Sequence, residues 1–178
     1  MKRSLIIILA IALPLCSWSQ SSWQGGTEQD VLPYLTGGYY FAAWAGKNHV
    51  RGRALLAKVN KPSFIVPSGF TNNQVTAIAL VADYFPKEKW RGWHLGAGVV
   101  WWQSSIQSNL RLSTVNYENV LLNGSVGYNW WFSPRFYLCP WAGLHLRVGG
   151  PSTVTVDNQS FDTPLFTPEA SLKVGWCF

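Results

Sequence analysis

Two serines, one histidine and one glutamate are the residues of this chain that could support nucleophilic catalysis. Ser125 or Ser171 would supply the hydroxyl, His145 the base, and Glu169 the acid that orients the imidazole. Such a set transfers acyl groups only if the hydroxyl lies within hydrogen-bond reach of the base. Ser125 lies well along one predicted strand, and the sequence leaves the register of the strand that carries Ser171 and Glu169 open. We therefore expect no catalytic residues.

Metal, cofactor and nucleic-acid chemistry have still less support. Two cysteines and three histidines follow residue 19, at no spacing typical of a zinc site. Only 12% of the residues are charged, and Lys and Arg form no stripe of the kind that binds nucleic acid. We expect no metal, no cofactor and no nucleic-acid partner.

The N-terminus has the three parts of an export signal. Met1, Lys2 and Arg3 form a cationic start, residues 4–15 are apolar, and small residues follow at Ser17 and Ser19. This pattern predicts a secretory signal peptide over residues 1–19, cleaved before residue 20. The apolar run is too short to span a bilayer as a helix. Residues 20–178 remain as one domain.

Apolar side chains alternate with other residues through most of that domain. The alternation is clearest in residues 93–102, 120–132 and 136–148, and we predict further strands at 39–45, 51–59, 74–85 and 168–178. The clear runs are longer than a typical strand of about 5–6 residues. They match the roughly 9–11 residues that cross a bilayer as a tilted strand.

The connections between these strands alternate in length. Residues 46–49, 86–92 and 133–135 form short turns, whereas 60–73, 103–117 and 149–167 form long loops. Short turns at one end and long loops at the other are typical of an outer-membrane barrel whose long loops lie outside the cell. Aromatic residues also gather at the turn-side ends, as in an interfacial girdle. They are Tyr84, Phe85, Trp90, Trp93, Trp130, Phe132, Phe136, Trp176 and Phe178.

The last strand is amphipathic and ends on Trp176 and Phe178. With the signal peptide and the loop pattern, residues 39–178 resemble the small OmpA/OmpX-like outer-membrane β-barrel superfamily. The resemblance implies an all-β, antiparallel transmembrane β-barrel, monomeric, in the outer membrane of a Gram-negative bacterium and surrounded by its lipids. It also implies that the barrel-assembly machinery reads Trp176 and Phe178 as a C-terminal signal.

The number of strands is the main open point. We count seven, but a barrel whose two ends lie on the same side needs an even number. The eighth must lie in residues 20–35, where 21–27 is polar and a helix capped by Thr27 could begin. Either a weak first strand closes the barrel or this segment plugs it, and we favour eight strands.

The polar face of each strand should point into a narrow lumen that side chains fill. Unpaired charges there are costly, so we expect a hydrogen-bonded network. Hairpin pairing would place Asp83 near His94, and His145 near Glu169. The inward set is Arg51, Arg53, Asp83, His94, Asn123, Asn129, His145, Arg147, Glu169 and Lys173.

Function is then expected in the long loops, because loops on a rigid scaffold usually carry it. We expect a non-enzymatic barrel that is structural or binds a surface ligand, which the sequence does not identify. In the longest loop, 149–167, the candidate contacts are Asp157, Phe161, Asp162 and Phe166. Two alternatives remain, a lipid-modifying outer-membrane enzyme and a secreted soluble β-barrel carrier. Some small barrels modify lipids, but this chain lacks the His-x-Ser motif that lipid A deacylases show.

Cys139 and Cys177 both fall on inward positions of consecutive antiparallel strands. If Val148 lies opposite Pro168, these cysteines face each other within disulfide range. A register slip of two residues would separate them. The sequence therefore leaves both a disulfide and two free thiols open.

Overall fold

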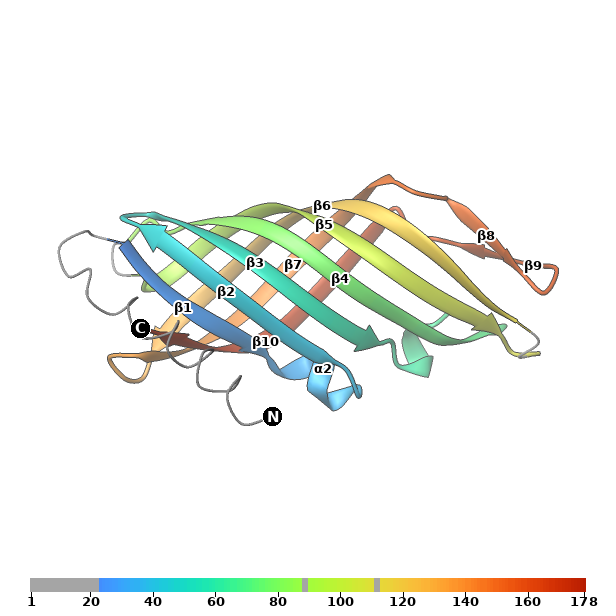
Figure 1. Ribbon diagram of the computed structural model, residues 1–178, viewed down its shortest axis with the longest axis horizontal. Coiled ribbons are helices and arrows are strands. Elements are labelled where there is room, and N and C mark those ends of the chain that lie inside the picture. The colour runs from blue at the N-terminus through green and yellow to red at the C-terminus, as the bar shows by residue number, and fades with distance from the viewer. Residues whose placement is uncertain (1–22, 88–89, 111–112) are drawn as a thin grey trace, which may run out of the picture.

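The computed structural model describes residues 23–87, 90–110 and 113–178, so the predicted signal peptide at 1–19 lies outside the described residues. Eight antiparallel strands close into a barrel in the order β1-β10-β7-β6-β5-β4-β3-β2 (Figure 1). The predicted eight-stranded antiparallel barrel is confirmed. Its strands are β1 Trp23–Asp30, β2 Tyr39–Lys47, β3 Val50–Asn60, β4 Phe70–Tyr84, β5 Gly92–Ser108, β6 Thr114–Trp131, β7 Phe136–Gly149 and β10 Phe166–Cys177.

The polar segment before residue 36 contributes both a strand and a helix. β1 pairs with β2 on one side and with β10 on the other, which closes the ring. The short helix α2, Val31–Leu35, follows directly, and the Asp30 side chain caps it by accepting from the backbone N–H of Leu32 at 3.1 Å. A cap at Thr27 is wrong, because Thr27 still pairs with Ala43 and Trp176 as part of the strand.

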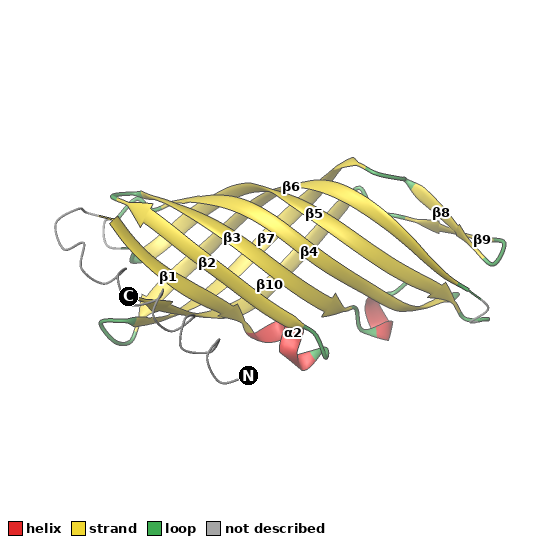
Figure 2. Ribbon diagram, in the orientation of Figure 1, coloured by secondary structure: helices red, strands yellow, loops and turns green. Residues whose placement is uncertain are grey.

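The barrel has two unlike ends, which we call the turn end and the loop end. The turn end carries the connections at 48–49, 85–91 and 132–135 together with Trp23 and the C-terminus. The loop end carries α2, the 3-10 helix η2 at Ser63–Ile65, the end of β5 at Ser108 with the start of β6 at Thr114, and the segment 150–165 (Figure 2). None of the described helices is long and apolar enough to cross a membrane.

Two of the predicted long loops are shorter than expected. β4 begins at Phe70, β5 runs to Ser108 and β6 begins at Thr114, so much of 103–117 is a hairpin. The many polar side chains of this region obscured its strands in the sequence, although the backbone pairing continues through it.

The third long segment contains a hairpin of its own, β8 Thr153–Val156 and β9 Gln159–Asp162. Its turn residues Asp157 and Asn158 have φ of 48° and 63°, as two-residue hairpins of this kind require. The hairpin packs against the extended β5–β6 pair through a loop-end cluster. The cluster consists of Ile106, Val154, Val156 and Phe161, with Phe70, Val115 and Tyr117 partly buried against it.

The outer face of the strands forms an apolar belt. Its outward charged residues, such as Lys47, Lys58 and Glu118, lie toward the strand ends. Exposing so much contiguous apolar surface to water is not typical of a soluble protein. The belt includes the exposed side chains of Ile78, Leu80, Leu95, Val99, Leu122, Val126, Leu144 and Leu172, with Trp93, Trp130, Phe136 and Trp176 toward the turn end.

Candidate functional site

An ion cluster of four buried residues crosses the lumen in its turn half. Arg51 lies 2.9 Å from a carboxylate oxygen of Glu28 and 2.9 Å from one of Asp83. Arg53 spans the same two acids, at 3.0 Å from Glu28 and 3.1 Å from Asp83. The Tyr137 hydroxyl donates to Glu28 at 2.7 Å and accepts from Arg51 at 3.0 Å. Each buried charge therefore meets two opposite charges, which offsets its loss of hydration.

Aromatic side chains fill the space between this cluster and the turn end. The Arg51 guanidinium lies 5.1 Å from the ring centroid of Trp44 and 5.2 Å from that of Phe85. Trp90 has a φ of 56°, which is rare for a bulky residue. Two hydrogen bonds stabilise this backbone conformation: the Trp90 carbonyl oxygen accepts one from the Asn129 side chain at 3.1 Å and one from the Trp131 indole at 2.9 Å. The turn half of the lumen is thus packed.

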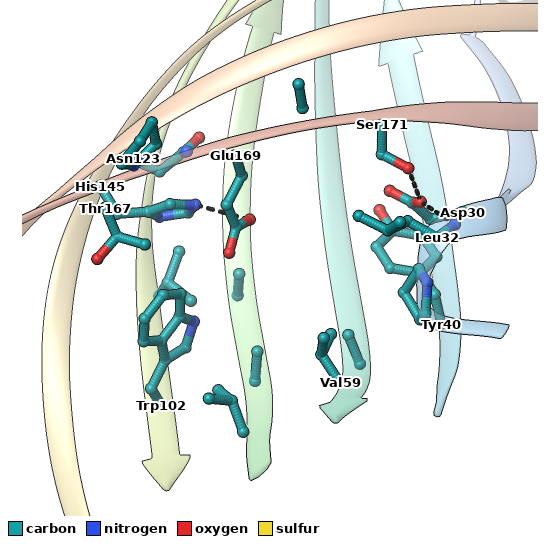
Figure 3. Close-up of a pocket in the computed structure, with 18 of the residues that line it drawn as sticks. Asp30, Leu32, Tyr40, Val59, Trp102, Asn123, His145, Thr167, Glu169 and Ser171 are labelled. Atoms are coloured by element: carbon teal, nitrogen blue, oxygen red, sulfur yellow. Dashed lines mark hydrogen bonds and ion pairs between the residues drawn. The ribbon is translucent and has the colours of Figure 1, made fainter. Parts of the chain in front are cut away.

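The loop half of the lumen holds a cavity of about 650 Å³. One wall consists of small apolar residues on β3, β4 and β5 (Figure 3). Small residues at inward positions leave space that larger side chains would fill in an eight-stranded barrel. The expectation that side chains fill the lumen therefore holds for the turn half and is wrong for the loop half. The small wall residues are Ala57, Val75, Ala77, Ala79, Val81 and Val100.

The facing wall of the cavity is polar. Asp30 accepts hydrogen bonds from the Ser171 hydroxyl and, at 3.1 Å, from the Trp141 indole. The Lys173 ammonium lies 3.9 Å from the ring centroid of Trp141 and 5.7 Å from that of Tyr40. Figure 3 shows Asp30, Ser171 and Tyr40 together on this side of the cavity.

A histidine–glutamate pair lies on the cavity wall away from Asp30 (Figure 3). His145 Nε2 and Glu169 Oε2 are 3.1 Å apart, as hairpin pairing predicts, and the Trp102 ring lies 5.4 Å from the imidazole. Lys61, in the loop after β3, places its ammonium 5.2 Å from the Trp102 ring centroid. Burial lowers the pKa of Lys61, and the Glu169 carboxylate partly offsets this.

The structure brings base and acid together without a nucleophile. Asn123, and not a serine, lies opposite His145 across β6 and β7, and Ser125 lies opposite Gly143. The Ser171 hydroxyl is engaged by Asp30. The arrangement can hold a proton between His145 and Glu169, but it does not activate a serine. Among the described residues, no group of three His, Cys, Asp or Glu side chains could hold a metal ion.

The inward residues form several separate groups instead of one network. Arg51, Arg53 and Asp83 meet in the ion cluster. Asp83 lies opposite Gly96, so His94 is its diagonal neighbour on the same face, near it as hairpin pairing predicts, but within the described residues the two form no ion pair. His94 stacks on Phe85 instead, with ring centroids 4.7 Å apart.

Two further members of the predicted network have other surroundings. Arg147 donates to the carbonyl of Gly150 at 3.3 Å, at the loop end, because it lies too far along β7 to reach the ion cluster. Lys173 stacks on Trp141 and joins no ion pair within the described residues.

Sequence reasoning missed three residues of the lumen: Glu28, Asp30 and Tyr137. Two arginines spaced two apart on one strand must share a buried face, and Asp83 alone cannot balance both. That imbalance was a signal for a second inward acid. Glu28 and Asp30 have the same period-two spacing, but the glycines and polar residues of 23–30 obscured the strand.

The four proposed loop contacts have different surroundings. Asp157 accepts from the hydroxyls of Ser108 and Ser113, each at 2.6 Å, so it ties the β8–β9 hairpin to the β5–β6 tip. Phe161 is only 4% exposed, inside the loop-end cluster. Asp162 accepts from Thr153 and is exposed; Phe166 is exposed at the cavity mouth. Their role in binding stays a prediction.

Of the two alternatives that the sequence leaves open for Cys139 and Cys177, the structure has the free thiols, and both are buried. Lys173, and not Cys177, lies opposite Cys139, because Pro168 pairs with Leu144. The assumed pairing of Pro168 with Val148 is therefore wrong by four residues. The physical reason is that the β8–β9 hairpin separates β7 from β10, so no tight turn fixes their register.

The C-terminal residues complete the barrel at the turn end. Trp176 and Phe178 point outward, with ring centroids 4.9 Å apart, and Trp176 stacks on Phe136. The Phe178 N–H donates to the carbonyl of Gly25 at 3.0 Å, which joins the end of the chain to its first described strand. Recognition of these two aromatic residues during assembly stays a prediction.

No family model matches the sequence, and no curated protein matches it. Two solved structures share its fold. Neisserial surface protein A (NspA) is 13% identical with a TM-score of 0.54, over 88% of this chain and 94% of that one. The N-terminal β-barrel domain of Pseudomonas aeruginosa OprF is 13% identical with a TM-score of 0.53, over 88% and 96%. The chain thus has the fold of the small outer-membrane β-barrels, as the resemblance implies.

Proposed function

We propose that this chain is a non-enzymatic outer-membrane protein whose folded loop end presents a binding surface. The observation that carries the proposal is the loop-end cluster. It gives β8–β9 and the extended β5–β6 hairpin a common apolar core beyond the belt, with Phe161 at its centre. A surface that is ordered before binding loses less conformational entropy when a partner docks.

The apolar belt supports a membrane location. Lipid would cover side chains such as Leu80 and Leu95, which otherwise face water. A soluble carrier would keep such residues inside, so the belt argues against that alternative. We take the outer membrane of a Gram-negative bacterium as the location and residues 1–19 as the export signal.

The packed turn half supports a role other than transport. Among the described residues, the ion cluster and the aromatic residues behind it occupy the turn half of the lumen, where a porin has a water-filled channel. The purified barrel should therefore show no stepwise conductance in planar bilayers. Regular channel openings would contradict the proposal.

Surface display is tested with an epitope inserted between Asp157 and Asn158, at the exposed hairpin turn. Antibody should bind this epitope on intact cells, and protease should remove it there. An epitope between Asn48 and His49, at a turn of the opposite end, is the matched control and should react only in lysed cells. The reverse result would overturn the orientation and with it the binding surface.

Assembly is tested at the last residue. Deletion of Phe178 should lower the amount of folded barrel in the outer membrane, because the barrel-assembly machinery would lose the aromatic end that we propose it recognises. Phe132→Ala, which removes an outward aromatic residue at the same end, is the control. Normal levels of protease-resistant barrel after the deletion would reject this role of Phe178.

The enzymatic alternative has its own measurement. Mass spectra of lipid A and phospholipids from cells with and without this protein should be the same. A gained or lost acyl chain that depends on His145 would replace the proposed function with lipid modification.

A further inference from the structure

One buried cation in the loop half of the lumen has no acceptor. Lys173 is 3% exposed, and its ammonium rests on the face of Trp141. Within residues 23–87, 90–110 and 113–178, no Asp or Glu oxygen lies within 4.0 Å of Lys173 Nζ, and no hydrogen-bond acceptor meets it. An ammonium carries three N–H donors, and those of Lys173 are accessible from the cavity, where an acceptor can meet them.

The surrounding charges do not supply that acceptor. Asp30 lies directly opposite Lys173 across β1 and β10, but its carboxylate is not within 4.0 Å of the ammonium. Its two oxygens are already engaged by the Leu32 backbone, the Trp141 indole and the Ser171 hydroxyl. The acids of the ion cluster are held by the two arginines.

One wall of the cavity that Lys173 lines is apolar, and the cavity extends along β10. Ala57 and Ala77 lie opposite each other on β3 and β4, and Ala79 follows on the same face. Cavity-lining residues of β10 run from Lys173 to Phe166, seven residues and about 23 Å of extended strand. A volume of about 650 Å³ lies within the range of small-molecule sites.

The mouth of the cavity is also apolar. Phe64 and Ile65 on η2, Leu32 on α2, and Phe166 line it and are exposed, Phe64 to 85%. Apolar side chains gathered at one opening mark a place where an apolar molecule can bind or pass.

We propose that this cavity binds a linear carboxylate of the fatty-acid class, with its head on Lys173 and its alkyl chain along Ala57, Ala77 and Ala79. The carboxylate supplies the missing acceptor, and the small residues leave room for an unbranched chain. This site lies inside the barrel and goes beyond the proposed loop surface, so either can fail without the other.

Binding is measured with radiolabelled dodecanoate and with dodecanol on barrels in phosphatidylcholine nanodiscs free of detergent. We expect one saturable dodecanoate site per barrel and at least about tenfold weaker binding of dodecanol, because only the carboxylate makes charge-assisted bonds to Lys173. Nanodiscs that carry the Ala77→Phe barrel correct for partition into lipid, since this substitution should fill the cavity. Equal saturable binding in the Ala77→Phe barrel would overturn the proposal.

The head assignment is tested separately. Lys173→Met should lower dodecanoate affinity to that of dodecanol, whereas Lys173→Arg should keep most of it. Unchanged dodecanoate binding by Lys173→Met would overturn the assignment. All variants are checked for the folded form by their mobility in unheated gels.

A measurement on the unmodified chain covers the case in which a variant fails to fold. A dodecanoate carrying a diazirine at its far end should crosslink to peptides of β3, β4 and the cavity mouth. Crosslinks confined to the outward residues of the apolar belt would overturn the proposal. So would a co-purified phospholipid that dodecanoate does not displace, because the acyl chain of a membrane lipid would then be the occupant.

Discussion

The two halves of the lumen are built from the same strands but are filled in different ways. In the turn half, Arg51, Arg53, Glu28 and Asp83 pair with one another and aromatic rings take up the remaining space. In the loop half, alanines and valines line one wall and leave a cavity. The backbone pairing continues through both halves. Side-chain size at inward positions, and not the barrel fold, therefore decides whether the lumen is closed.

The difference also separates stability from ligand binding. Removing one member of a fully paired ion cluster leaves the charges of its partners buried and without an opposite charge. Changing a residue on the wall of a cavity requires no such rearrangement, because space is already present. We expect substitutions in the turn half to be costly and those in the loop half to be tolerated.

The largest effect is expected for Glu28→Ala. The two guanidinium groups would share Asp83 alone, and the free energy of unfolding should fall by about 3–5 kcal/mol. Urea unfolding in lipid vesicles, followed by tryptophan fluorescence, measures this loss. Glu118→Ala is the control, since the exposed Glu118 carboxylate accepts a single hydrogen bond among the described residues, from Gln103 at 3.3 Å. Equal losses in the two variants would mean that the ion cluster does not stabilise the barrel.

Gly175→Ala should have the next largest effect. A Cβ at this position would lie 2.0 Å from Cζ of the Tyr137 ring, which its bonds to Arg51 and Glu28 hold in place. Overpacking of this kind costs about 1–3 kcal/mol. Gly124→Ala meets nothing within 4 Å and should change stability by less than about 0.5 kcal/mol. A tolerated Gly175→Ala would show that the turn half can rearrange.

Ala79→Leu should have the opposite sign. The larger side chain would enter the cavity and raise the free energy of unfolding by about 0.5–2 kcal/mol. Ala82→Leu is the control. It adds the same side chain to the outward face of β4, so it shows the effect of the larger side chain outside the cavity. A loss of stability for Ala79→Leu would mean that the loop half has no free space at this position and is packed like the turn half.

Glu169→Ala should have the smallest effect. The Glu169 side chain is 41% exposed, and His145 is its one ion-pair partner within 4.0 Å in the described part of the chain, so the loss should stay below about 1 kcal/mol. Its measured loss can be compared directly with that of Glu28→Ala under the same conditions. Similar values for the two acids would remove the distinction between the halves.

Alternation of side chains was sufficient to predict the barrel and the inward direction of most charged residues. It reveals β5, β6 and β7 because one face of each is outward and apolar. It fails for β1, whose outward positions include Gly25, Thr27 and Gln29, because that strand is recognised only through its partners. The hairpin turn at Asp157 and Asn158 carried a readable signal, since these residue types tolerate positive φ.

The cavity could not be predicted in the same way. Its volume depends on which small residues face each other across the lumen, and therefore on the register of every strand. The register between β7 and β10 depends on a hairpin of their connecting segment, which is why the pairing of Cys139 with Cys177 was wrong. The composition and the alternation of side chains do not determine which residues face each other across the lumen.

The ring closes where the first strand meets the last, and this has a consequence for the order of folding. β1 and β10 pair only from Gly26 to Asp30, and the bond from Ser171 to Asp30 joins residues 141 positions apart. Every other pair of neighbouring strands in the ring is joined by a connection much shorter than this, the longest of them from Gly149 to Phe166. Those pairs can therefore form with a smaller loss of chain entropy. Closure between the two ends should therefore be the slowest step, as for other contacts of high sequence separation. During refolding, the Glu28 amide should then become protected from deuterium exchange later than the amides of β5 and β6.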